Sequence, residues 1–310
     1  MESKSRPPAD ARPGAGMVTW EIHREIVLVL AWGRAVLLQF AHPLIAAGVG
    51  DHSAFGTECW GRLRRLERTL DAMLRLTFGT AEEARGIARR INAIHDRVHE
   101  CLREAAGIFP AGTTYSARDP ALLRWVHGTL IESHLIVYEL YVGPLTVEKK
   151  DRYCVEASGV EQFLGIPEGA LPRSFAELGE YRDRMLASGE IVVTERARAI
   201  ARAVVVPPVP RLARPGLRLI QLPTIGLLPP AIREAYGFPW SPRDELALYR
   251  SARAIRALLP LVPSLVREWP AARAAGAARR GRSARHLDED PRRSSGGSDR
   301  LRYGRQREVS

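Results

Sequence analysis

Apolar residues recur at helical spacing along most of the chain between residues 17 and 273. From Trp60 to Leu76, one face of a helix collects Leu63, Leu66, Leu70, Met73 and Leu74. Spacings of three and four residues place side chains on the same side of a 3.6-residue turn. No run of alternating apolar and polar residues is long enough to predict a strand. The pattern therefore predicts an all-α fold, a single domain of about ten helices.

Start and stop signals give the bounds of several helices. Thr80, followed by acidic residues, is an N-cap that opens a helix expected to run to about Ala105. The pair Asp119 and Pro120 starts another helix, which we expect to end before Gly143. Further helices are predicted at 147–164, 174–187, 194–203 and 242–259.

The most apolar stretch runs from Ile26 to Gly50. Arg34 and the pair His42-Pro43 interrupt it, whereas a membrane-spanning helix needs about 20 nearly uninterrupted apolar residues. We therefore expect buried helix here. A helix end or kink is expected at His42, because the residue before proline disfavours helical geometry.

Most of the net charge lies near the C-terminus. The chain has 46 Lys and Arg against 35 Asp and Glu, a formal net charge of +11. Residues 271–310 carry +6 of this and residues 1–16 carry +1, which leaves +4 for residues 17–270. A domain with so little excess charge gives no reason to expect specific nucleic-acid binding.

Both ends have the composition of disordered segments. Residues 1–16 form a polar, Pro-rich leader, and residues 274–310 form a tail of Arg, Ala, Ser and Gly, leaving 17–273 as the domain. The leader lacks the apolar core of a secretory signal, which favours a cytoplasmic protein. The tail suits at most a weak peripheral contact with an anionic membrane, at about 1 kcal/mol for each basic charge.

The usual signatures of catalytic and metal sites are missing from the sequence. Cys59, Cys101 and Cys154 are odd in number and form no CxxC pair, which argues against a disulfide framework or a zinc ribbon. No glycine-rich phosphate loop follows a strand, and no GxSxG elbow occurs. Candidate chemistry therefore rests on the histidines.

His95 and His99 are four residues apart, the spacing of a zinc-binding helix without the Glu of HExxH. His95 shares its helix face with Ile91 and Val98, so we expect it to be buried. A buried imidazole without partners costs about 1–3 kcal/mol. Axial ligation of a haem iron, a non-haem metal site that includes Asp96, and an ordinary hydrogen-bonded core histidine all remain open.

Several short motifs, taken in order, resemble one family. They are GRAVLLQ at 33–39, AHP at 41–43, GV at 48–49, HS at 52–53, RLERT at 65–69, FG at 78–79, IHDRV at 94–98, YSARDP at 115–120 and WVH at 125–127. This series is similar to the catalytic domain shared by the MpaB-type oxygenases of fungal secondary metabolism and the bacterial latex-clearing (rubber) oxygenases. The similarity covers roughly residues 17–260.

The resemblance implies an all-helical domain that encloses one haem b, with dioxygen as co-substrate. It assigns the proximal iron ligand to His95, in the centre of a helix. It assigns the distal side to Arg65, Arg68 and Thr69, which share one helix face. A lysine that caps the iron in rubber oxygenases corresponds to Arg68, a poor ligand because guanidinium stays protonated. We therefore expect water or an open position at the iron.

The resemblance also implies a distal acid that helps to abstract a proton. Asp51 and Glu58 are the candidates, and burial would have to raise the pKa of the carboxyl group that serves. His127 lies on one helix side with Ile131 and His134. It either binds at the cofactor cavity or fills the core with its hydrogen bonds satisfied.

The expected function is that of a haem-dependent oxygenase that cleaves a C=C bond in a small apolar, isoprenoid- or lipid-like substrate. Rubber itself is not the expected substrate, because a polymer outside the cell demands export. Two alternatives stay open: a helical protein that binds haem or an apolar ligand without turnover, and a non-haem metalloenzyme using His95 and His99. If haem is the ligand of His95, the apoprotein should be unstable.

Overall fold

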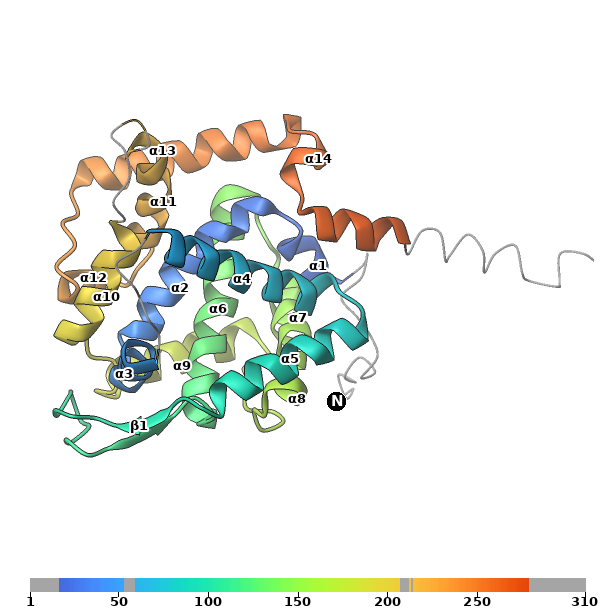
Figure 1. Cartoon of the computed structure of the whole chain (residues 1–310). Coiled ribbons are helices and arrows are strands. Elements are labelled where there is room, and N and C mark those ends of the chain that lie inside the picture. The colour runs from blue at the N-terminus through green and yellow to red at the C-terminus, as the bar shows by residue number, and fades with distance from the viewer. Residues whose placement is uncertain (1–16, 53–58, 207–211, 213, 279–310) are drawn as a thin grey trace, which may run out of the picture.

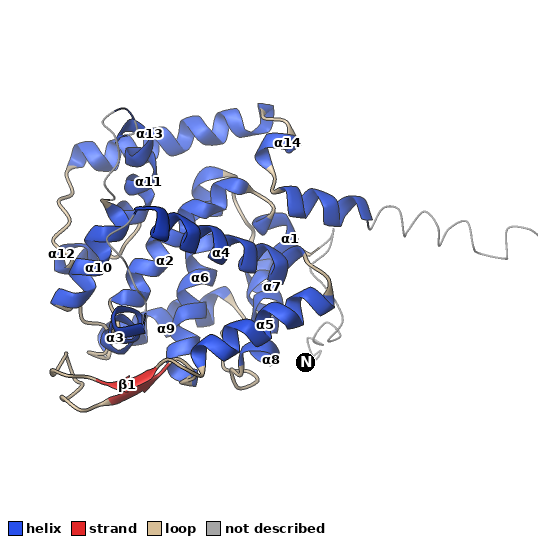
Figure 2. Ribbon diagram, in the orientation of Figure 1, coloured by secondary structure: helices blue, strands red, loops and turns tan. Residues whose placement is uncertain are grey.

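The computed structural model describes residues 17–52, 59–206, 212 and 214–278. Within them, one short antiparallel hairpin interrupts an otherwise helical architecture, so the predicted all-α fold is confirmed (Figures 1 and 2). With η for 3₁₀-helices, the elements are α1 (Val18–His23), η1 (Ile26–Val29), α2 (Leu30–Phe40), α3 (Pro43–His52), α4 (Cys59–Phe78), α5 (Ala81–His95), β1 (His99–Cys101), β2 (Thr114–Ser116), α6 (Pro120–Tyr141), α7 (Val147–Ala157), η2 (Ser158–Val160), α8 (Glu161–Leu164), α9 (Phe175–Ala187), α10 (Glu195–Val205), α11 (Arg214–Gly226), α12 (Pro230–Ala235), α13 (Pro242–Leu258), η4 (Leu259–Leu261) and α14 (Ser264–Arg267).

The predicted helix starts at Thr80 and Asp119 are confirmed. Thr80 Oγ1 accepts a hydrogen bond from the Glu83 amide (3.1 Å), and the Glu83 carboxylate accepts one from the Thr80 amide (2.6 Å). This capping box satisfies two backbone donors at the start of α5. Asp119 Oδ1 accepts a hydrogen bond from the amide two residues later (2.8 Å) and so caps α6. The end of α6 at Tyr141 also agrees with the prediction.

The predicted extension of α5 to Ala105 is wrong, because the helix ends at His95. Strands β1 and β2 pair beyond it, in the register that places His99 opposite Ser116. Gly107 and Gly112 adopt positive φ between the two strands, where the chain reverses. The cross-strand hydrogen bonds satisfy backbone groups that a longer helix would have paired internally. Tertiary pairing thus overrides the helical pattern of this segment.

The apolar stretch from Ile26 to Gly50 divides into η1, α2 and α3. A bend of 104° separates α2 from α3, and the predicted kink at His42 is confirmed. The Leu44 amide donates a hydrogen bond to His42 Nδ1 (3.3 Å), so the imidazole satisfies a donor at the start of α3. In the described residues no single helix is long and apolar enough to cross a membrane, although this bent pair passes by length and composition.

The other predicted helices are present with small changes of bounds. The segment 147–164 is divided by a 3₁₀ turn into α7, η2 and α8. Helices α9, α10 and α13 occupy the segments predicted at 174–187, 194–203 and 242–259.

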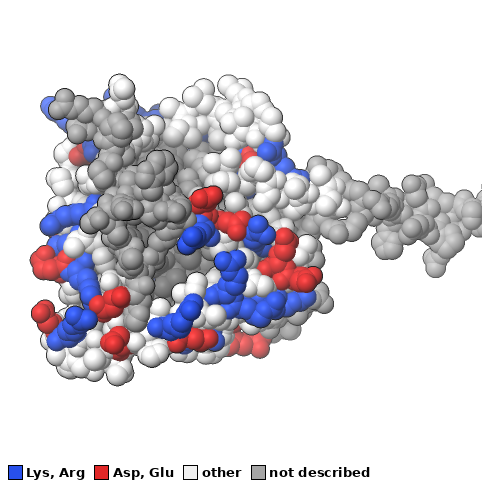
Figure 3. Space-filling model, in the orientation of Figure 1, with Lys and Arg blue, Asp and Glu red and all other residues white. Residues whose placement is uncertain are grey.

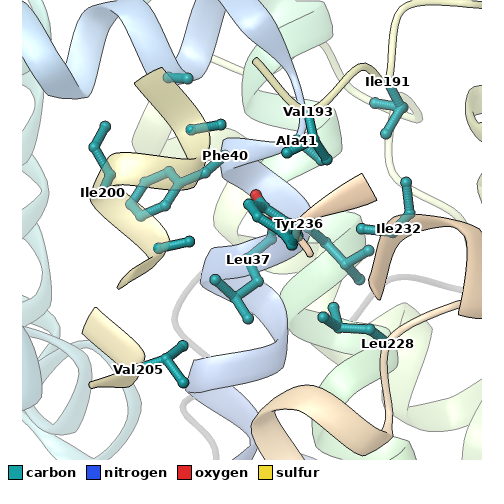
Figure 4. Close-up of a cluster of buried hydrophobic side chains, with 14 of the residues drawn as sticks. Leu37, Phe40, Ala41, Ile191, Val193, Ile200, Val205, Leu228, Ile232 and Tyr236 are labelled. Carbon is teal, nitrogen blue, oxygen red and sulfur yellow. The ribbon is translucent and has the colours of Figure 1, made fainter. Parts of the chain in front are cut away.

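Helix α2 is the central element of the fold and packs mainly against α6 and α11. The approach to α11 depends on Gly33, because a Cβ there would lie 2.8 Å from Thr224 Cγ2 and closer still to Thr224 Oγ1. Figure 4 shows the apolar cluster around α2, to which α10 contributes Ile200 and the end of α12 contributes Tyr236. Burying such side chains supplies most of the favourable free energy of folding.

A buried ionic network crosses this apolar interior. Arg34 donates hydrogen bonds to Glu132 Oε2, Ser133 Oγ and the Leu227 carbonyl, each 2.8 Å long. Arg182 donates to the second Glu132 oxygen at 2.7 Å. The network connects α2, α6, α9 and the end of α11, and its polar atoms are paired as burial requires.

The C-terminal part of the described chain returns to the N-terminal part. Arg267 forms two hydrogen bonds of 2.7 Å with the buried carboxylate of Glu25. Residues 270–278 are helical, so the first five residues of the segment assigned to a disordered tail belong to a helix. Residues 279–310 and 1–16 lie outside the described residues. On the face that α5 presents, basic and acidic side chains are interspersed (Figure 3).

Candidate active site

A cavity of about 660 Å³ lies among the helices that surround α6. Residues of α1 to α8 and of the β2 segment line it. In Figure 1, α4 and α5 cross in front of α6. Most lining side chains are aliphatic or aromatic, and sites for small organic ligands typically have volumes of about 300–1,000 Å³. The cavity therefore suits an apolar molecule.

His95, the last residue of α5, lines this cavity. Burial lowers the pKa of its imidazole, the positive charge of Arg118 lowers it further, and Asp96 opposes the shift. Its Nδ1 atom is buried and has no hydrogen-bond partner among the described residues. The predicted burial is confirmed in part, because the side chain is half-buried and borders the cavity. Its predicted place in the centre of a helix is wrong.

Arg118 holds the end of α5 against the start of α6. Its Nε donates to Asp96 Oδ1 and its Nη1 donates to Asn92 Oδ1, both at 2.8 Å. Asn92 in turn donates to the Phe163 carbonyl at 2.9 Å, which connects α5 to α8. These contacts fix the backbone on either side of His95.

The sequence left His127 either at the cofactor cavity or in the core. The structure places it on α6, where it lines the cavity. Burial lowers the pKa of His127 to about 4, and the proximity of His95 contributes to the shift. Both imidazoles line the same cavity, and the lowered pKa of each favours the neutral form at pH 7. A neutral imidazole has a lone pair available to a metal ion or a proton donor.

The structure places only part of the predicted distal group at the cavity. Thr69, on α4, is one of the lining residues. Arg68 is exposed and does not line it. The side chain of Arg65 lies outside the described residues.

Asp51 lies at the end of α3 and contacts the hairpin and α10. The Arg196 guanidinium forms an ion pair with it, and the Tyr115 hydroxyl donates to Asp51 Oδ2 at 2.9 Å. The hydrogen bond from Arg196 is the main reason that the pKa of Asp51 is lowered. A proton-abstracting carboxylate needs the opposite shift. The other candidate acid, Glu58, lies outside the described residues.

The pairing of His95 with His99 on one helix turn is wrong. His99 is exposed in β1 and does not line the cavity. In the part of the chain that the structure describes, no group of three or more His, Cys, Asp or Glu side chains is arranged to hold a metal ion. The geometry therefore gives no support to a non-haem metal site at these residues.

The further polar side chains that line the cavity include His23 on α1, His134 on α6 and Tyr153 on α7. The spacing of seven residues predicts that His127 and His134 lie on the same face of their helix. His23 gave no signal, because it stands alone on a short helix far from the others in sequence.

Comparison with known proteins gives one match. A family profile described as "ER-bound oxygenase mpaB/B'/Rubber oxygenase, catalytic domain" matches residues 20–257. The searches of curated proteins and of solved structures found no match. The matched range contains every cavity-lining residue except Met17 and Thr19. The chain therefore belongs to the mpaB/rubber oxygenase family, and most of it is an oxygenase-type catalytic domain.

Proposed function

We propose that this protein is a haem b-dependent oxygenase that uses dioxygen to cleave a C=C bond of an isoprenoid- or lipid-like substrate. One observation carries the proposal: a neutral imidazole, that of His95, borders a large apolar cavity with its Nδ1 atom unpaired among the described residues. Buried polar atoms are normally hydrogen-bonded, so an unpaired one indicates a missing ligand or a functional role.

The residues present fit a haem. The cavity has room for an organic ligand, its walls are mainly apolar, and His95 offers a neutral nitrogen of the type that ligates haem iron. Haem, when bound, supplies a redox-active iron that reacts with dioxygen. Arg68, exposed beside Thr69, offers no nitrogen suited to ligate iron, because guanidinium stays protonated.

The chain's own side chains perform the remaining tasks. Arg118 and Asn92 hold the end of α5 and so orient His95. Thr69 and His127 are polar groups at the cavity wall and are candidates to hydrogen-bond a polar ligand atom. Aliphatic side chains from α2 and α6 exclude water from the substrate. The side chain of Arg65 lies outside the described residues, and a positive charge from it in the site stays a prediction.

The test is an absorption spectrum of protein purified after expression with haem supply. We expect a Soret band that is lost in His95→Gly and restored by added imidazole, because free imidazole replaces the missing ligand. The matched control is His99→Ala, which removes an exposed histidine four residues further on and should keep the band. A wild-type protein without the band, or a band unchanged in His95→Gly, contradicts the proposal.

Turnover is tested separately by oxygen uptake. Haem-loaded protein should consume oxygen with a short polyisoprenoid and yield carbonyl products. Arg65→Ala should reduce the rate, whereas Arg75→Ala, on the same helix and paired with Asp71 at the surface, should not. A Soret band without oxygen uptake identifies a haem-binding protein that lacks catalysis.

A further inference from the structure

His23, His134 and Tyr153 form a compact polar cluster in the wall of the cavity. His23 Nε2 and the Tyr153 hydroxyl are 2.8 Å apart. The rings of His23 and His134 meet edge to face, with 4.5 Å between their centroids. The cluster joins α1, α6 and α7, which are brought together only by the fold.

The cluster lies at a distance from the His95 end of the cavity. His127 and His134 are both on α6, seven residues apart, which corresponds to two helical turns and about 10 Å along the helix axis. The cavity wall between them is apolar and includes Leu130 and Ile131. Along α6, the cavity wall thus has two histidines separated by apolar residues.

The cluster is built from neutral groups. Burial lowers the pKa of His23 to about 4 and lowers that of His134 well below its usual value, while burial raises the pKa of Tyr153. His134 is only 2% exposed, and its ring meets the ring of His23 edge to face. A neutral imidazole has one N–H donor and one acceptor nitrogen, the groups that a hydroxyl or carbonyl oxygen requires.

The surroundings disfavour an anionic ligand. Glu156, which follows Tyr153 on α7, also lines the cavity; its Oε1 accepts from Arg152 Nε at 3.0 Å, and its Oε2 accepts hydrogen bonds of 2.7 Å from the amide and the hydroxyl of Thr19. A carboxylate at this place repels a second negative charge. The lining arginine of the described chain, Arg173, already donates hydrogen bonds to Glu161 and Ser158.

We propose that His23, His134 and Tyr153 form a second binding site, which holds the neutral hydroxyl or carbonyl oxygen of an elongated apolar molecule whose chain extends along α6 toward His95. The inference rests on the proposed function and names its substrate class: a chain with an uncharged oxygen at one end, such as an isoprenoid alcohol. Anchoring that oxygen fixes which part of the chain lies near His95, because the separation along α6 is set by the helix.

The test compares three probes on the full-length, haem-supplied protein: geranylgeraniol, the hydrocarbon with the same chain but no hydroxyl, and geranylgeranoic acid. Binding is followed by quenching of tryptophan fluorescence, since Trp32 lines the cavity, and in parallel by the Soret band. We expect the alcohol to bind about three- to tenfold more tightly than the hydrocarbon, as one or two neutral hydrogen bonds provide, and the acid to bind more weakly than the alcohol.

Two variants assign the preference to the cluster. Tyr153→Phe removes one hydroxyl, and His134→Leu replaces an imidazole by an apolar side chain of similar size. Both should bind alcohol and hydrocarbon with nearly equal affinity while the hydrocarbon affinity stays at the wild-type value. Tyr138→Phe is the matched control, since that buried tyrosine is on α6 but does not line the cavity, and it should keep the preference.

Three outcomes overturn the proposal. The first is a preference for the alcohol that persists in Tyr153→Phe and His134→Leu. The second is tighter binding of the acid than of the alcohol. The third is loss of the Soret band in both variants, which would make the cluster part of the haem site. The fluorescence measurement does not require haem. A wild-type protein without a Soret band therefore contradicts the proposed function and leaves the alcohol preference measurable on its own.

Discussion

Arg34 on α2 and Glu132 on α6 form an ion pair of 2.8 Å in which the two side chains are only 3% and 5% exposed. A charge left alone at such a place has neither water nor a partner. Removing one member of the pair would therefore leave an unpaired charge in the interior. The pair also connects α2 and α6, the two helices that carry much of the cavity wall.

Glu132→Ala should lower the free energy of unfolding by about 3–5 kcal/mol, because it leaves Arg34 buried without its main acceptor. Urea denaturation measures the change. Asp71→Ala, which breaks the exposed pair with Arg75, is the control and should have no measurable effect. A double variant, Arg34→Met with Glu132→Leu, should lose less than Glu132→Ala alone, and a larger loss would contradict this explanation.

Gly33→Ala should destabilise the protein by about 1–3 kcal/mol, because the added methyl group overlaps the Thr224 side chain and forces α2 away from α11. Gly216→Ala is the matched control on α11, since a Cβ there meets no atom within 4 Å. That variant should be neutral or more stable by up to about 1 kcal/mol through helix propensity. Thermal melts of both variants compare them directly, and a Gly33→Ala variant as stable as the wild type would refute the close contact.

Stability should fall as the pH decreases from 6.5 toward 4. His23 and His134 have lowered pKa values in the folded state, so the unfolded chain binds more protons in this interval. Stability is then fully present above the unfolded pKa of about 6.5 and decreases with falling pH. Urea titrations between pH 7 and pH 4.5 measure the slope. His134→Leu should reduce it by up to about 1.4 kcal/mol per pH unit, and an unchanged slope would mean that His134 is not buried as a neutral group.

Asp51 should affect the stability of the protein at lower pH than the two histidines do. Its pKa is lowered in the folded state by Arg196, so its contribution is present above the unfolded pKa and is lost as the pH falls below about 4. Asp51→Asn should therefore destabilise the protein at pH 7 and have little effect at pH 3. If it abolishes oxygen uptake while stability at pH 7 is unchanged, Asp51 has a direct part in the reaction instead.

Deleting residues 279–310 should leave the Soret band and the melting temperature unchanged. Every residue that lines the cavity lies between Met17 and Arg173, and the helical residues 270–278, with buried Ala272, are kept. Spectroscopy and a thermal melt of the shortened protein measure both. Loss of haem from this variant would show that the domain extends past residue 278.

Local signals predicted the helix starts well and one helix end poorly. The caps at Thr80 and Asp119 depend on side chains within three residues of the helix they open, so the sequence contains the whole interaction. The end of α5 at His95 depends on pairing between β1 and β2, which lie on either side of a chain reversal. The helical pattern of the segment after His95 contains no information about β2, the strand that pairs with it.

The candidate site was likewise predictable only where it depends on local sequence motifs. The motif around His95 pointed to a residue that lines the cavity, and the profile match confirmed the family. Whether the imidazole borders a cavity, and whether its Nδ1 atom has a partner, depends on α6 and on Arg118. Asp51 differs from the expectation. Arg196 from α10 lowers the pKa of its carboxyl group, whereas the expected role as a base required a raised pKa.

The sequence by itself determined the all-α class, most helix starts and the family, because periodicity, caps and ordered motifs are local properties of the chain. Only the tertiary structure decided that His23, His134 and Tyr153 meet in the cavity of His95, because His23 lies more than a hundred residues before the other two and all three come from different helices. Contacts between distant segments form when apolar faces pack, and their charges and hydrogen bonds follow from that packing.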